Sequence, residues 1–143
     1  MAEYLLGMNA KIYQGLADAA LGSLTLMGNV KDVTLNLTAA EADVTSRANS
    51  GWKSVAAALR EASVDFQMVW KPADAGFTAI KDAYLAGTVV ELAVLDQDRA
   101  TTGAQGLKGN FSISSFTREE PLEGGIMVSV TAKLAKFNAW VVV

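Results

Sequence analysis

The chain has 143 residues and a formal net charge of −3, with 51% hydrophobic and 19% charged residues. A chain of this length and apolar content predicts one folded domain with a buried core. It contains neither cysteine nor histidine, which excludes disulfides, serine–histidine and cysteine–histidine catalysis within one chain, and the commonest zinc ligands. The acidic balance excludes a chain-wide basic footprint for nucleic acid. We therefore expect no enzyme, no metal and no cofactor.

The sequence also bears on location. The first residues carry Glu3 and an apolar stretch too short for a secretory signal. No apolar run approaches the ~20 residues of a membrane-spanning helix. We therefore expect a protein made in the cytoplasm that has no membrane partner.

The spacing of apolar residues predicts mainly strands. A weak first strand at 9–14 and a short one at 24–27 flank a loop rich in glycine and alanine. Alternation of apolar and polar residues predicts strands at 31–38 and 63–71. The strand predicted at 88–95 is almost entirely apolar, which is typical of a strand covered on both faces. Two long strands follow at 107–117 and 126–137, and a slip of phase near Ser114–Ser115 indicates a bulge.

One long helix is predicted between two of these strands. It covers Asp74–Leu85, with Asp74 as its N-cap, an apolar stripe through Phe77 and Ile80, and Gly87 after its end. A shorter helix is predicted at Trp52–Arg60, where apolar residues recur at helical spacing. The expected fold is a single mainly β domain over 1–143, an antiparallel β-sandwich or partly open barrel with one flanking α-helix.

Three segments do not suit an isolated monomer. Residues 38–60 are predicted to form a long polar loop between strands, and such loops are usually functional. Residues 1–8 form an apolar arm and residues 139–143 an apolar tail, although terminal segments are usually polar. We interpret the arm and the tail as contacts between subunits, and we expect the fold to survive deletion of the tail. Their apolar residues are Tyr4, Leu5, Leu6, Trp140, Val141, Val142 and Val143.

We interpret the polar clusters as solvated turns and loops and not as catalytic, metal-binding or phosphate-binding sites. Glu119–Glu123 is typical of a solvated hairpin turn. Asp96 and Asp98 lack the later glutamate that a calcium loop requires. The glycines of 103–106 precede a strand, whereas a phosphate-binding loop opens onto a helix.

The segment 41–60 carries a recognisable pattern. An acidic residue and Asp-Val-Thr are followed by a short polar run, Gly-Trp, a basic residue and Leu-Arg. This segment resembles the tail tube, or major tail, proteins of long-tailed bacteriophages, prophages and gene-transfer particles. The order of elements is similar from Lys31 to Asn138. The matching residues are Glu41, Asp43, Val44, Thr45, Ser50, Gly51, Trp52, Lys53, Leu59 and Arg60.

The resemblance implies a structural protein whose subunits form six-fold rings that stack into a hollow tube. One sheet of each subunit then lines a channel through which DNA passes without specific binding. The implied partners are further copies of the chain, other tail proteins at the tube ends and a tape-measure protein inside. The implied location is the virion tail, assembled in the host bacterial cytoplasm. The long loop is expected to reach the adjacent ring through Glu41, Asp43, Val44, Thr45, Arg47, Asn49, Gly51 and Trp52.

Three alternating strand faces are candidates for the channel lining: Asp32/Thr34/Asn36, Ser63/Asp65/Gln67 and Met127/Ser129/Thr131. Because a sandwich has two outer sides, we expect that not all three line the channel. The favoured face is Asp32, Thr34 and Asn36, since its carboxylate repels phosphate. Two alternatives stay open. One is the inner tube of a contractile injection or secretion machine, and the other is a small-ligand-binding β-barrel, which predicts a monomer.

Overall fold

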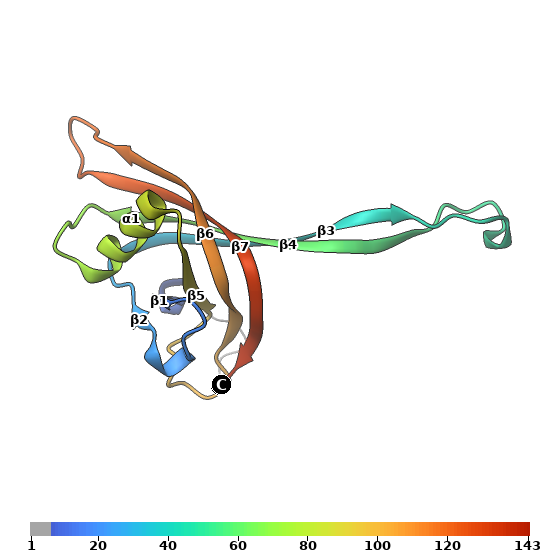
Figure 1. The fold of residues 1–143 in the computed structure, drawn as a ribbon, viewed down its shortest axis with the longest axis horizontal. Coiled ribbons are helices and arrows are strands. Elements are labelled where there is room, and N and C mark those ends of the chain that lie inside the picture. The colour runs from blue at the N-terminus through green and yellow to red at the C-terminus, as the bar shows by residue number, and fades with distance from the viewer. Residues whose placement is uncertain (1–6) are drawn as a thin grey trace.

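The computed structural model describes residues 7–143. Their strands form one antiparallel sheet of seven strands in the order β2-β1-β5-β6-β7-β4-β3, with the single α-helix α1. The elements are β1 Lys11–Leu16, β2 Thr25–Leu26, β3 Val30–Asp43, β4 Val55–Val69, α1 Ala75–Ala86, β5 Val89–Leu95, β6 Gln105–Glu119 and β7 Met127–Val142. The mainly antiparallel β fold with one flanking helix is therefore confirmed, as an open and strongly curved sheet (Figure 1).

The main core lies inside the curve of the sheet. The alternating residues of β4 that were predicted to point inward, Val64, Phe66 and Met68, are buried there together with Phe77 and Ile80 of α1. Asp74 caps α1 by accepting a hydrogen bond from the backbone N–H of Phe77 at 3.0 Å, and Gly87 ends the helix at a left-handed φ of 70°. Both ends of the long helix were thus correctly predicted to within a residue.

Strand β5 is covered on both faces, as its composition predicts. Val90 and Leu92 belong to the main core, whereas Ala93 and Leu95 belong to a smaller cluster on the other side. Glu91 is fully buried on that other side. Its carboxylate accepts hydrogen bonds from Lys108 Nζ at 2.6 Å and from Asn138 Nδ2 at 2.7 Å, so its charge is compensated.

The structure corrects the prediction of a loop at 38–60. Strand β3 extends to Asp43, strand β4 begins at Val55, and the two remain paired up to Asp43↔Val55. The connection between the strands is therefore only 44–54, and the rest is a two-stranded hairpin. The helix predicted at Trp52–Arg60 is wrong. The alanine-rich run 56–58 has a high intrinsic helix propensity, but pairing with β3 overrides it.

The prediction that an apolar tail follows the last strand is also wrong. Trp140 and Val141 are part of β7 and pair with Leu107 and Gly106 of β6. The N–H of Val143 donates to the carbonyl of Ala104 at 2.8 Å, so residues 140–143 extend the sheet. Of the apolar arm 1–8, residues 7 and 8 lie in a short 3₁₀ turn, and Tyr4, Leu5 and Leu6 lie outside the described residues. No helix within 7–143 has both the length and the apolar character that crossing a bilayer requires.

Candidate assembly surfaces

The strands β6, β7, β4 and β3 share one polar face. The register places Thr34, Asp65, Thr131 and Ser115 side by side across these four strands. A second row joins Asn36 to Ser63, Lys133 and Ser112, and a third joins Gln67 to Ser129 and Thr117. The three faces that the sequence proposed for a channel lining are thus one continuous surface. The premise that these faces are divided between the two outer sides of a sandwich is wrong, because the strands belong to one sheet and not to two.

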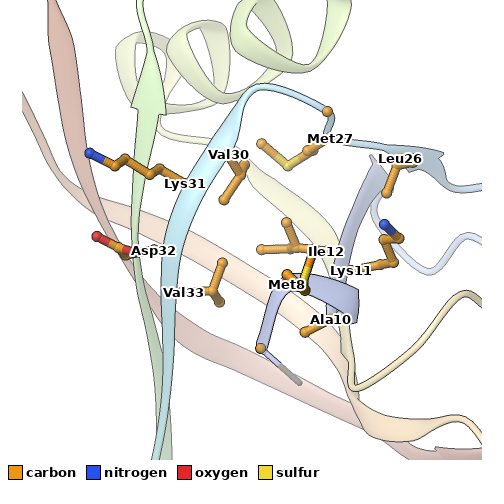
Figure 2. A pocket seen from close by; sticks show the side chains of 12 residues that line it. Met8, Ala10, Lys11, Ile12, Leu26, Met27, Val30, Lys31, Asp32 and Val33 are labelled. Atoms are coloured by element: carbon orange, nitrogen blue, oxygen red, sulfur yellow. The ribbon is translucent and has the colours of Figure 1, made fainter. Parts of the chain in front are cut away.

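Hydrogen bonds fix the centre of this polar face. The Asp65 carboxylate accepts from Asn36 Nδ2 at 3.0 Å and from Thr131 Oγ1 at 2.7 Å. These contacts link β3, β4 and β7 on the side opposite the core. Asp32 lies in an irregular stretch of β3, where the register shifts between Val30 and Val33. Figure 2 shows Asp32 and Lys31 pointing to the same side, away from Val33, so the polar face carries both acidic and basic groups.

Both lateral edges of this four-stranded unit are open. Strand β3 pairs with β4 on one side, and none of the described residues forms a strand on its other side. Strand β6 pairs with β7 up to Glu119, but β5 covers it only as far as Ser112. The second half of β6 and most of β3 therefore present unpaired backbone groups, which are a template for pairing with another chain.

The β3–β4 hairpin forms a long arm that extends far beyond the rest of the molecule (Figure 1). Its apolar side chains are exposed, including Leu37, Val55 and Leu59, the last with 84% of its surface accessible. An isolated two-stranded hairpin is at best marginally stable in water. The arm therefore has the properties of an element that is completed by a partner.

Polar residues of the arm tip build its local structure. Asp43 accepts a hydrogen bond from the Thr45 N–H at 2.9 Å. The side chain of Thr45, and next its backbone N–H, lower the pKa of the Asp43 carboxyl. The Thr45 hydroxyl also accepts from the N–H of Ser54 at 2.8 Å, which joins the two ends of the tip. Asn49 Nδ2 donates to the Trp52 carbonyl, and Gly51 has a left-handed φ of 84°.

The remaining residues of the tip are available for contact. Val44 and Trp52 are 53% and 76% exposed, and Glu41 and Arg47 are exposed charges. The sequence analysis assigned all eight residues listed for the loop to contact with the adjacent ring, because alternation and spacing do not distinguish a side chain that closes a turn from one that projects outward. Asp, Thr and Asn often form hydrogen bonds within turns, and this tendency could have identified the residues that close the tip.

A further apolar surface lies where the arm leaves the body. A groove of about 570 Å³ is lined there by Leu37, Ala39, Leu107, Leu134, Phe137 and Trp140. Trp140 is 48% exposed and its Nε1 donates to Gln105 Oε1 at 3.0 Å. The sequence singled out Trp140 but neither Phe137, which lies near it in the same strand β7, nor Leu37, which comes close to it only through the folding of the sheet. Among residues 7–143 no cluster of acidic side chains is arranged to hold a metal ion.

Comparisons with known proteins agree with this arrangement. The sequence profile of a family described as phage tail tube protein matches residues 11–136, which confirms the resemblance found in segment 41–60. No curated protein matches the chain.

Solved structures give the same fold. A chain of the tail of an empty gene transfer agent particle, refined with C6 symmetry, is 23% identical with a TM-score of 0.74, over 98% of this chain and 99% of that one. The SPP1 tail tube is 19% identical with a TM-score of 0.76, over 98% and 81%. A chain of the native gene transfer agent virion is 22% identical with a TM-score of 0.73, over 95% and 100%.

Proposed function

This chain belongs to the phage tail tube protein family, and on that premise we propose that its copies form closed rings that stack into the hollow tube of a virion tail. The observation that carries the proposal is the unit of β6, β7, β4 and β3. It is polar on one face, apolar on the other, and open along both lateral edges. A sheet of this kind satisfies its open edges by pairing with copies of itself.

Ring closure follows from the directions of the strands. The four strands alternate in direction, so β3 of one copy placed beside β6 of the next copy is again antiparallel. Rotation about a common axis then joins the units into one continuous barrel with the polar face inside. We propose six copies per ring, since the gene transfer agent tail of the same fold was refined with C6 symmetry.

The arm serves stacking between rings in this proposal. It projects beyond its own body, and an interface that does not close along the tube axis generates a filament. Val44 and Trp52 at the tip are the proposed apolar contacts, with Glu41 and Arg47 as charges beside them. The groove at Phe137 and Trp140 gives the neighbouring copy a second apolar surface.

The proposed role is structural, without catalysis or a cofactor. The Asp32, Thr34 and Asn36 side chains line the channel together with Ser63, Asp65, Gln67, Ser129 and Thr131. DNA passes this surface without specific binding in this proposal, because most of its side chains are uncharged and its acidic groups repel phosphate, although Lys31 and Lys133 also lie on it. The proposed partners are a tape-measure protein inside the tube and other tail proteins at its ends. The proposed place of assembly is the host bacterial cytoplasm.

Disulfide trapping and electron microscopy test the ring. The chain has no cysteine, so cysteines at Asn36 and Thr117 report only on the β3–β6 junction. The expected result is tubes of uniform diameter and an oxidised ladder of chains that ends at six. A double variant with cysteines at Asn36 and Leu122 is the control, since Leu122 lies on the exposed β6–β7 hairpin. A protein that stays monomeric and unlinked at high concentration would instead support the ligand-binding barrel.

A further inference from the structure

The second half of β7 pairs irregularly with β6. Residues 134–140 of β7 lie opposite residues 107–111 of β6, so β7 has two residues more than its partner in this stretch. Ala135 and Asn138 have no partner on β6, and each forms a β-bulge.

The two bulges decide which side chains face the apolar groove. Leu134, Phe137 and Trp140 are three residues apart in the sequence, and all three line the groove. In a regular strand every second residue shares a face. Without the bulges, Lys136 and Asn138 would therefore lie on the groove side and Phe137 on the opposite side.

A buried charge on the opposite side of the sheet holds the second bulge. The Glu91 carboxylate is fully buried, and its two oxygens accept from Asn138 Nδ2 at 3.0 and 2.7 Å. Lys108 Nζ donates to the same carboxylate at 2.6 Å. Because a buried carboxylate is costly without hydrogen-bond partners, these contacts favour the register that keeps Asn138 beside Glu91.

A second polar contact holds the first bulge. Lys136 Nζ donates to the Asp18 carboxylate at 3.0 Å, and buried Asn110 donates to the same carboxylate at 3.1 Å. Gly109 lies between the two bulges, where an added Cβ would be only 2.8 Å from the Lys136 carbonyl oxygen. The bulged arrangement thus also depends on a glycine at this position.

We propose that Glu91, acting through Asn138, determines the register of the end of β7 and so places Phe137 in the groove. Strand β4 pairs with β7 only up to Lys133, so the following segment can also pair with β6 without bulges, two residues out of register. In that regular register Phe137 lies opposite Lys108, where its ring displaces the partners of a buried charge. Buried polar groups can fix a register at a cost in stability.

Disulfide trapping on the unassembled subunit reads the register directly. In the cysteine-free chain, Gln105→Cys is combined either with Val142→Cys, its partner in the structure, or with Trp140→Cys, its partner in the regular register. We expect the first pair to oxidise at least tenfold faster than the second when the rest of the chain is unchanged.

Replacing both charges by leucine separates register from stability. Apolar residues of similar size often replace a buried ion pair without loss of stability, so Glu91→Leu/Lys108→Leu should unfold at no lower urea concentration than the parent. It should nevertheless speed oxidation of the 105–140 pair, relative to the 105–142 pair, at least tenfold. Glu91→Gln keeps an acceptor for Asn138 and should retain the parent preference. Lower stability with an unchanged preference would show a merely structural role and overturns the proposal.

Asn138→Leu tests the register where the double variant does not fold. It leaves the Glu91–Lys108 ion pair intact and removes the contact through which Glu91 acts on β7. The 105–140 pair should again gain at least tenfold, and an unchanged preference contradicts the proposal. The further expectation that these variants form fewer tubes rests on the proposed function. Since the register is read without assembly, a parent chain that forms no tubes would reject that function and leave this inference intact.

Discussion

Asp43 and Thr45 act on the arm tip itself. Their side chains close the turn that leads from β3 into the tip, and the Thr45 hydroxyl bridges to Ser54 on the returning strand. The backbone N–H of Val44, between them, donates to the Ser54 carbonyl at 3.0 Å, whereas its side chain is half exposed and takes no part in this network. At the scale of single residues, the Asp-Val-Thr pattern thus combines two side chains that shape the tip with one that faces outward.

The lowered pKa of Asp43 makes the tip sensitive to acid. A carboxyl whose pKa is lower in the folded state contributes stability above its unfolded pKa, ~3.9, and loses it as the pH falls through the folded value. We expect the Thr45 amide resonance in NMR spectra to be constant above pH 5 and to titrate below about pH 4. Asp43→Asn keeps an acceptor for the Thr45 N–H but removes the charge. That variant should show no titration, and a similar titration in it would contradict the assignment to Asp43.

Trp52 is the residue of the tip with the most apolar surface to bury. Trp52→Ala is expected to change the free energy of unfolding of the subunit by less than about 0.5 kcal/mol, because the side chain is 76% exposed. It should raise the critical concentration for tube formation roughly 30-fold, which corresponds to a loss of about 2 kcal/mol at a contact centre. Sedimentation of assembled tubes measures this. Leu122→Ala is the matched control, since Leu122 is fully exposed away from the arm.

At the scale of elements, the end of β7 is part of the sheet of its own subunit, whereas its apolar composition suggests a tail that contacts other subunits. Trp140 and Val141 pair with β6, and Val141 packs on the small cluster around Tyr13 and Leu95. Removing 140–143 takes away backbone hydrogen bonds and apolar burial together. The deletion should therefore cost the subunit about 2–4 kcal/mol of stability, measured by urea unfolding.

Trp140→Ala separates the contribution of the backbone hydrogen bonds at this strand end from that of its apolar side chains. It leaves the backbone pairing with Leu107 intact but removes much of the apolar groove beside Phe137. We expect a loss below about 1.5 kcal/mol in urea unfolding, because the indole is half exposed, together with weaker tube formation. A truncated chain as stable as the intact one would show that the β6–β7 pairing there contributes nothing.

The arm is expected to gain order on assembly. Its paired strands expose both faces, and alanine at 56–58 favours helix over strand in isolation. Amide exchange of residues 39–60 should be fast in the free subunit and at least a hundredfold slower in tubes, whereas exchange at Phe66 and Met68 in the core should not change. Equal exchange of 39–60 in the two states would exclude an interface role for the arm.

The same alanines show how far the sequence determines the elements. Where alternation is strong, as at Val64, Phe66 and Met68, the strand and its inward face are predictable because burial and pattern agree. At 55–60 the pattern fits a helix, and only the partner strand decides otherwise. The capped helix α1 was predictable because Asp74 and Gly87 act locally, whereas the extension of β7 through Trp140 depends on pairing with Leu107 of β6.

At the scale of the whole molecule, the order of strands in the sheet cannot be predicted from the alternation of apolar and polar residues. Each strand's polar residues are readable from the sequence, but the pairing that places Thr34 beside Asp65 and Thr131 is not. Once the order β6-β7-β4-β3 is known, separate polar faces become one surface. The same order brings Lys133 beside Ser63, so the proposed channel lining carries basic as well as acidic groups, which the face of Asp32, Thr34 and Asn36 alone does not indicate.

The channel assignment predicts an effect of charge on DNA transport. Asp32→Lys reverses one charge per subunit on the polar face, and ring symmetry repeats it as a positive band at every level of the tube. Asp32 accepts no side-chain hydrogen bond from the described residues, so tubes should still form. DNA ejection from particles carrying this variant should slow about tenfold in low salt and recover as salt releases the phosphate contacts. Leu122→Lys adds a positive charge on an exposed hairpin away from the polar face and should leave ejection unchanged. Normal tubes with salt-independent ejection in the Asp32→Lys particles would place this face on the outside of the tube.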